Sequence, residues 1–286
     1  MQKILITGSN GFIGQYFIQK YQNKYSFQTF SFLRDKLEQL ELNNINTIFY
    51  LSALVHQMSG ASDREYERVN VTQTLQLAKK AKESGVKQFV FMSTIKVYGE
   101  ESDVVYTEES VCTPQDEYGK SKLKAEKLLL EMEDTTFKVT IVRTPIVYGY
   151  GVKANIRNLI NLINKTPVLP FGSIKNRRSM VYIGNLCHLV DTVIQQKCSG
   201  VYLASDNEVI STTQLVQYIA NALGKRIYLI KVPFFESLLK FFKPSFYKRL
   251  YGSLEVNNER TKQKLFLENL YTLEEGISFT IKGENI

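Results

Sequence analysis

Short apolar runs alternate along the chain with segments in which apolar residues recur at helical spacing. This alternation predicts an α/β fold, with a doubly wound parallel sheet covered by helices on both faces. The predicted helices are 12–20, 66–84 and 117–132, and Gly85 is expected to end the second of them. The predicted strands are Ile4–Ile6, Phe27–Leu33, Thr47–Leu51, Phe89–Met92, Val139–Val142 and Val201–Ala204.

Three glycines follow the first predicted strand and open the first helix. A glycine-rich turn alone could be a simple connection, but its place between strand and helix favours the phosphate loop of a dinucleotide-binding, Rossmann-type fold. There the glycines let the backbone turn sharply, approach a pyrophosphate and pack helix against sheet. The residues expected to contact the cofactor here are Gly8, Asn10, Gly11, Phe12, Ile13 and Gly14.

Arg34 follows the second predicted strand, where dinucleotide-binding folds usually carry an acidic ribose ligand. A guanidinium suits a 2′-phosphate, so this position predicts NADP as the cofactor, with NAD as the alternative. A solvated surface arginine is the competing interpretation, because Asp35 is adjacent and strand ends are the least certain part of such a prediction.

Tyr118 and Lys122 stand four residues apart at the head of the third predicted helix, so both side chains face the same side. A fixed cation beside a phenol favours the phenolate, which would let Tyr118 exchange a proton with a substrate oxygen near neutral pH. Ser93 and Thr94 follow a predicted strand at the carboxyl edge of the sheet, where such folds bind ligands. We therefore expect Tyr118, Lys122, Thr94 and Ser93 to form a catalytic group.

These segments together resemble the extended short-chain dehydrogenase/reductase family, in its NAD-dependent epimerase/dehydratase branch that acts on nucleotide sugars. The resemblance extends from Met1 to about Gly283 and implies that Tyr118 and Lys122 are the active pair, with Thr94 as the helper hydroxyl. It also implies cofactor contacts from Leu51, Ser52, Ala53, Lys122 and Pro145. The segments that carry it are 7–14, 51–53, 69–71, 92–99, 118–122 and 143–149.

The resemblance also implies where a UDP-sugar would bind. Relatives hold the nucleobase and diphosphate with residues that match Asn155, Leu169, Phe171 and Arg178, and a guanidinium can grip phosphate oxygens in bidentate fashion. A surface arginine is the alternative for Arg178. His56 and Lys96 are weaker candidates for contact with the sugar, because a loop histidine is more often structural.

Loose patterning after Gly149, with four prolines and a basic segment at 175–178, predicts a second lobe that covers the first. We expect residues 1–148, with about 181–205, to form the dinucleotide-binding Rossmann domain. Residues 149–180 and 206–286 would form a smaller mixed α/β substrate-binding lobe. The aromatic and basic stretch 234–249 is expected to be a helix of this lobe that packs its Phe and Leu side chains inward, with a membrane surface as the alternative.

Composition narrows the class of protein further. The 286 residues, 44% hydrophobic and 22% charged, exclude disordered, collagen-like and disulfide-rich chains. A net charge of +8 favours an anionic partner, and a phosphorylated small molecule would suffice. Three scattered cysteines predict no disulfide framework and no metal centre. The N-terminus enters a strand at once, and no apolar stretch could span a bilayer, so we expect a cytoplasmic protein. We also expect it to be a homodimer.

Two enzymatic interpretations remain, and the cofactor separates them. Arg34 favours an NADP-dependent reductase, and several segments resemble reductases of UDP-4-keto-6-deoxy-N-acetylhexosamines in surface polysaccharide biosynthesis. The alternative is a UDP-hexose 4-epimerase that keeps its NAD. In the dehydratases of this family an acid–base pair stands where this chain has Ile95-Lys96, which disfavours a 4,6-dehydratase. A second departure is that residues 34–47 are too few for the helix and extra strand that the family usually has there. A non-catalytic, NADP-sensing or RNA-binding member is disfavoured because Tyr118 and Lys122 are both present, so we expect no nucleic-acid partner.

Overall fold

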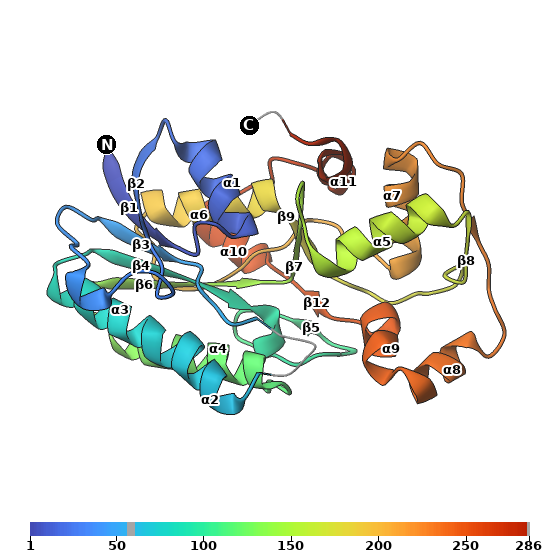
Figure 1. Cartoon of the computed structure of the whole chain (residues 1–286), viewed down its shortest axis with the longest axis horizontal. Coiled ribbons are helices and arrows are strands. Elements are labelled where there is room, and N and C mark those ends of the chain that lie inside the picture. The colour runs from blue at the N-terminus through green and yellow to red at the C-terminus, as the bar shows by residue number, and fades with distance from the viewer. Residues whose placement is uncertain (56–60, 285–286) are drawn as a thin grey trace.

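The computed structural model describes residues 1–55 and 61–284. At its centre lies a six-stranded, fully parallel sheet in the order β10-β6-β4-β3-β1-β2 (Figure 1). The strand order reverses beside β1, which has β2 on one side and β3 on the other, and open α/β sheets bind ligands at such a switch point. The strands are β1 Gln2–Thr7, β2 Tyr25–Phe30, β3 Thr47–Tyr50, β4 Gln88–Thr94, β6 Lys138–Thr144 and β10 Gly200–Leu203.

Helices cover both faces of this sheet, as the alternating pattern predicts. Side chains such as Ile4 and Ile6 pack with α1 and α6 on one face, whereas Leu5 and Ile48 pack with α3 and α4 on the other. Alternation along β1 thus divides the core into two layers. The bounds are α1 Phe12–Tyr21, α3 Gln73–Glu83, α4 Glu117–Glu131 and α6 Ile183–Gln195.

The second predicted helix is interrupted. It begins as α2 (Asp63–Tyr66), continues as a six-residue π-helical segment, η2 (Glu67–Thr72), and becomes regular only in α3. Gly85 ends α3 as predicted: it has a φ of +77°, and the N–H of Val86 binds the carbonyl of Ala81. The π segment packs against α4, and such bulges often occur at functional sites.

The second predicted strand ends earlier than the sequence indicates. β2 stops at Phe30 and is the edge of the sheet, and only a short 3₁₀ turn, η1 (Leu37–Gln39), lies between β2 and β3. The chain turns sharply after Ser31, whose carbonyl accepts the N–H groups of Arg34 and Asp35. The absence of a helix and extra strand here confirms the prediction from the segment's length.

The remaining elements lie at the carboxyl edge of the sheet and toward the C-terminal end of the chain. α5 and α7 share an apolar cluster with α1, α6 and one sheet face, so no solvent layer separates the two parts of the molecule. Among the described residues, no helix is long and apolar enough to cross a membrane. The elements are η3 Ile95–Val97, β5 Val105–Tyr106, β7 Ile146–Tyr148, α5 Ala154–Lys165, β8 Val168–Leu169, β9 Met180–Tyr182, α7 Thr212–Ala222, β11 Tyr228–Leu229, α8 Phe235–Phe242, α9 Pro244–Tyr251, β12 Glu255–Val256, α10 Glu259–Leu265 and α11 Leu273–Lys282.

The expectation that the stretch 234–249 packs its aromatic side chains inward is largely wrong. Phe235 and Leu239 contact the core, but no residue of α8 is fully buried. Phe234, Phe241 and Phe242 are 86%, 79% and 69% exposed. The stretch forms two helices, α8 and α9, instead of one, and much of the apolar side of α8 faces solvent.

Candidate active site

The glycine loop has the geometry that a phosphate-binding turn needs. Gly8 has a φ of +66°, and its carbonyl accepts the N–H of Gly11, which closes the turn before α1. A Cβ on Gly14 would lie 2.6 Å from the Gly8 carbonyl oxygen, so only glycine permits this approach of helix to loop. Asn10 and Gly11 are exposed at the amino end of α1, where free backbone N–H groups favour an anion. These residues fit a dinucleotide diphosphate.

The loop after β3 is held beside the glycine loop by Thr7, at the end of β1. The hydroxyl of Thr7 accepts the N–H groups of Leu51 and Ser52, each at 3.0 Å. Leu51, Ser52 and Ala53 are half-buried at the switch point of the sheet. The structure therefore brings both predicted cofactor segments to one edge.

Asn70 joins this loop to α4, a role that the sequence analysis did not assign. Its side chain is fully buried in η2, exchanges two hydrogen bonds with the backbone of Leu54 and donates to the hydroxyl of Ser121. Ser121 in turn donates to the carbonyl of Tyr118. In the sequence, the Val69-Asn70-Val71 motif marked this residue as part of the family resemblance. Its role could not be assigned there, because only the fold reveals the hydrogen-bond partners that a buried amide needs.

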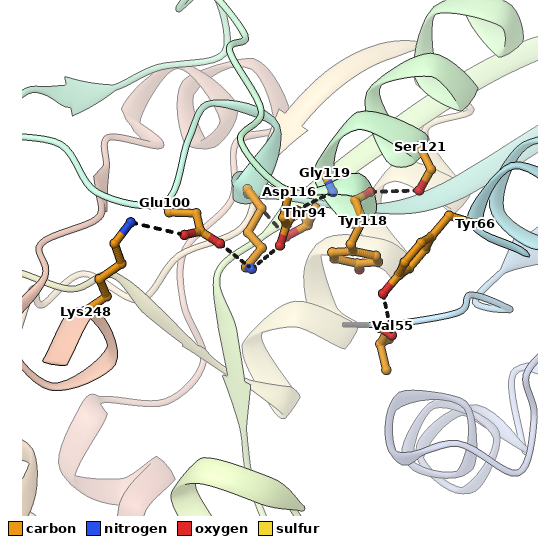
Figure 2. Close-up of polar contacts among 10 residues, drawn as sticks. Val55, Tyr66, Thr94, Glu100, Asp116, Tyr118, Gly119, Ser121 and Lys248 are labelled. Atoms are coloured by element: carbon orange, nitrogen blue, oxygen red, sulfur yellow. Dashed lines mark hydrogen bonds and ion pairs between the residues drawn. The ribbon is translucent and has the colours of Figure 1, made fainter. Parts of the chain in front are cut away.

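Tyr118 lies in the first turn of α4, which Asp116 caps. The carboxylate of Asp116 accepts the N–H of Gly119 at 2.7 Å. A Cβ on Gly119 would lie 2.9 Å from the carbonyl oxygen of Lys96, so this glycine lets α4 approach the segment that follows Thr94. Figure 2 shows Thr94 beside the capped helix end, with the Tyr118 ring next to Tyr66. The first turn of α4, which holds Tyr118, thus packs against the segment that follows Thr94.

The electrostatics of Tyr118 and Lys122 differ from the expectation. Burial, with smaller effects from Asp116 and Tyr66, raises the pKa of the Tyr118 phenol above its usual range. Burial lowers the pKa of Lys122 to about 7, against the opposing charge of Glu126. The ammonium of Lys122 lies 3.8 Å from the ring centroid of Phe91. Lys122 is therefore not among the groups that shift the pKa of Tyr118 in this structure, and burial favours the protonated phenol.

Ser93 belongs to a buried polar cluster, not to the face where Thr94 lies. Its hydroxyl donates to the carboxylate of Glu126, which also receives the Arg143 guanidinium at 2.6 Å. Arg143 donates further to the hydroxyl of Tyr98 at 2.7 Å. This is a correction to the expected role of Ser93, because adjacent strand residues point to opposite faces. The cluster fixes α4 against β4 and β6.

A chain of ion pairs extends from the head of α4 to α9 (Figure 2). Lys96 binds the carboxylates of Asp116 and Glu100, at 2.5 and 3.3 Å, and Glu100 lies 3.7 Å from the ammonium of Lys248. The Lys96 ammonium is therefore occupied by two carboxylates instead of pointing to a sugar. It holds the helix cap in place, which is a positioning role.

The residues predicted to hold the nucleobase and diphosphate differ in their exposure to solvent. Asn155 is exposed at the start of α5, whereas Leu169 and Phe171 are buried in the core, with 2% and 4% exposure. The guanidinium of Arg178 donates to the carbonyls of Lys248 and Gly252, at the carboxyl end of α9. Burial lowers the pKa of Arg178. Leu169 and Phe171 therefore offer almost no surface to a ligand in this structure.

Three other predicted residues have distinct environments. Arg34 is exposed in the turn beyond β2. The prediction placed it directly after the second strand, but β2 ends at Phe30, so Arg34 does not occupy the strand-end position where a ribose ligand is expected. Pro145 is buried between β6 and β7. His56 lies outside the described residues. Within the described ranges, no group of three or more His, Cys, Asp or Glu side chains could hold a metal ion.

Comparison with known proteins now identifies the class of enzyme. The profile of the NAD dependent epimerase/dehydratase family matches residues 4–204, and the chain belongs to this family. It is an NAD(P)-dependent enzyme of the nucleotide-sugar branch, as the resemblance implied.

Individual relatives narrow the comparison. A UDP-glucose 4-epimerase of Vibrio cholerae is 36% identical over 99% of this chain and 95% of its own length. An N-acetyl-α-D-glucosaminyl-diphospho-undecaprenol 4-epimerase of Escherichia coli O157:H7 is 26% identical over 81% of this chain and 75% of its own. Among solved structures, a UDP-glucuronic acid 4-epimerase from Bacillus cereus in complex with NAD has a TM-score of 0.79 at 19% identity, with 99% of this chain and 98% of that chain covered. A Pseudomonas aeruginosa protein, RMD, complexed with NADPH, scores 0.80 at 16% identity, with 99% of each chain covered. At these identities the structures show the shared fold.

Proposed function

We propose that the protein is a 4-epimerase of UDP-hexoses that uses bound NAD. The observation that carries this proposal is the approach of the first turn of α4, which holds Tyr118, to the segment that follows Thr94 at the carboxyl end of β4. The V. cholerae relative supports it, because its similarity covers nearly the whole chain. The sequence favoured a reductase because of Arg34 and of segments that resemble such reductases, but Arg34 stands beyond the end of β2.

The residues of this chain suit a reaction that returns the hydride to the same sugar. The cofactor would accept a hydride from C4 and give it back. Tyr118 would remove the proton of the C4 hydroxyl as the ketone forms and return it when the ketone is reduced, while Thr94 holds the same oxygen. The glycine loop would hold the cofactor diphosphate, and Lys122 would contact the nicotinamide ribose. No proton or electron is gained or lost overall, so the inversion at C4 requires only that the 4-keto sugar turns in the site.

A 4-reductase that consumes NADPH is the second candidate, and Arg34 is the observation that favours it. Its side chain is exposed in the turn that follows β2, the strand beside β1, and a guanidinium there suits a 2′-phosphate. The substrate would then be a UDP-4-keto-6-deoxy-N-acetylhexosamine. In either case Asn155 and Arg178 are proposed to contact the UDP portion.

One experiment separates the two candidates. We would incubate the protein with UDP-glucose or UDP-N-acetylglucosamine without added reductant, and in parallel with the 4-keto sugar and NADPH. Formation of the galacto isomers without net redox supports the epimerase. Loss of NADPH in proportion to the keto sugar, with no isomerisation, would overturn it in favour of the reductase.

Cofactor binding gives a second, independent measurement. The epimerase proposal predicts that NAD binds at least as tightly as NADP, and that Arg34→Ala leaves NAD affinity unchanged.

We also propose that the protein is a homodimer in the cytoplasm and has no nucleic-acid partner. Light scattering of the purified protein would test the dimer.

A further inference from the structure

The hairpin formed by α8 and α9 carries apolar side chains at the surface, away from the central sheet (Figure 1). Phe234, Phe241 and Phe242 are each more than two-thirds exposed, and Leu238 is 55% exposed. Exposed apolar side chains are ordinary when scattered, but an adjoining set on one element usually indicates a binding surface. Neither the epimerase nor the reductase candidate uses these residues.

The apolar side chains of α8 lie mainly on one side of the helix. Helical spacing places Phe235, Leu238 and Phe242 on one side of α8, and Lys240 on the other. Phe235 contacts the core, whereas Leu238 and Phe242 face Phe246 of α9 across a groove of about 810 Å³. The two short helices therefore form one amphipathic unit whose apolar side is open.

Positive charge is concentrated in the segment that carries this apolar side. The segment from Lys231 to Tyr251 holds five basic residues and one acidic residue, a net charge of +4 out of +8 for the whole chain. Lys243 and Arg249 line the groove itself. Protein–protein interfaces are depleted of lysine, whereas surfaces that bind anionic lipid combine Lys and Arg with Phe and Leu.

We propose that the α8–α9 hairpin docks on a bilayer surface that contains anionic lipids. Phe241, Phe242 and Leu238 would enter the boundary between headgroups and acyl chains, while the lysines contact the headgroup phosphates. The chain would lie on the membrane without spanning it. Because the carbonyls at the end of α9 hold the guanidinium of Arg178, docking would bring the proposed diphosphate site close to the bilayer.

Vesicle flotation tests this directly. The full-length protein should float with vesicles of phosphatidylcholine and phosphatidylglycerol and not with phosphatidylcholine alone, and high salt should release it. The double variant Phe241→Ser/Phe242→Ser should lower the partition coefficient by about tenfold or more. Lys240→Glu/Lys243→Glu should lower it by at least about tenfold as well.

Matched variants control for general loss of an apolar or basic side chain. Phe266→Ser removes a phenylalanine that is 94% exposed but lies at the end of α10, and it should leave flotation unchanged. Lys87→Glu/Lys165→Glu makes the same charge change at exposed positions outside the hairpin, and should weaken binding far less than Lys240→Glu/Lys243→Glu.

Two outcomes would overturn the proposal. One is equal behaviour of the wild type and both hairpin variants with anionic vesicles. The other is a wild-type oligomer that the hairpin variants dissociate, without flotation, which would make the hairpin a surface for self-association. The measurement needs neither sugar nor cofactor, so its result does not depend on the proposed epimerase activity.

Discussion

At the scale of single residues, the phenol of Tyr118 is the group on which the proposed chemistry depends. Tyr118→Phe removes the proton that is exchanged with the sugar but leaves the ring in place, so turnover should fall by about 10³-fold while NAD binding stays the same. Isomerisation rates and a cofactor titration on the same preparation would check this. A variant with near-normal turnover would exclude Tyr118 as the proton carrier.

Lys122 is held at a cost in stability. Its pKa of about 7 means that burial disfavours the charged form, whereas in the unfolded chain a lysine stays protonated up to about pH 10. The unfolded state therefore binds more protons between these values, and the wild-type protein should gain stability as pH rises through this window. The loss of folding stability that the buried lysine causes is fully present below pH 7.

Lys122→Met should therefore stabilise the ligand-free protein at pH 7, by on the order of 2 kcal/mol, while it abolishes turnover. The difference from the wild type should shrink as pH rises towards 10. Urea unfolding at a series of pH values measures it. Glu126 keeps its bond to Arg143 in this variant, so no buried carboxylate loses its partner. A constant difference across the pH range would contradict the assignment.

At the scale of the elements, the cap of α4 connects helix stability to the titration of Tyr118. Burial raises the pKa of that phenol, and the charge of Asp116 raises it further. Asp116→Asn can keep the cap but removes the charge, so the pKa should fall. Because the phenolate is the form that accepts the proton, the acid limb of the profile of kcat/KM against pH should move to lower pH.

Glu117→Gln is the matched control for this shift. It removes a carboxylate one residue away, which pairs with Lys120 at the surface and is not among the groups that raise the pKa of Tyr118. This control should leave the acid limb where it is in the wild type. If both variants move the limb equally, the effect comes from general surface charge.

The elements also show what the sequence could and could not predict. Alternating apolar runs gave the parallel sheet, and the glycine spacing gave the loop before α1, because both depend on local periodicity and backbone sterics. The roles of Ser93 and Asn70 needed the tertiary structure, since the partners Glu126 and Ser121 are distant in sequence. The exposed side of α8 also escaped prediction, because periodicity shows that a helix is amphipathic but not what covers its apolar side.

At the scale of the whole molecule, the C-terminal segment returns to the first helix. The carboxylate of Glu284 accepts hydrogen bonds from the hydroxyls of Tyr16, Tyr182 and Tyr271, and pairs with Lys20 at 3.0 Å. These partners come from α1, β9 and the segment before α11, so one carboxylate ties together parts of the chain that lie far apart in sequence.

This clamp predicts a specific loss of stability in acid. Burial alone would raise the pKa of Glu284, but the hydrogen bonds from Tyr182, Tyr16 and Lys20 outweigh it and hold the pKa below the usual range. The contribution of the carboxylate is therefore present above the pKa of an unfolded glutamate, about 4, and is lost as pH falls through the lower folded value.

Glu284→Gln should then lower the free energy of unfolding at pH 7 by about 2 kcal/mol, because an amide cannot accept four hydrogen bonds or pair with Lys20. The deficit should narrow below pH 4, where the wild-type carboxylate itself becomes protonated. Urea unfolding at both pH values would measure this, with Glu268→Gln, an exposed position, as the control that should change little. A deficit that stays the same in acid would mean that packing, and not the charge of Glu284, joins the C-terminal end to α1.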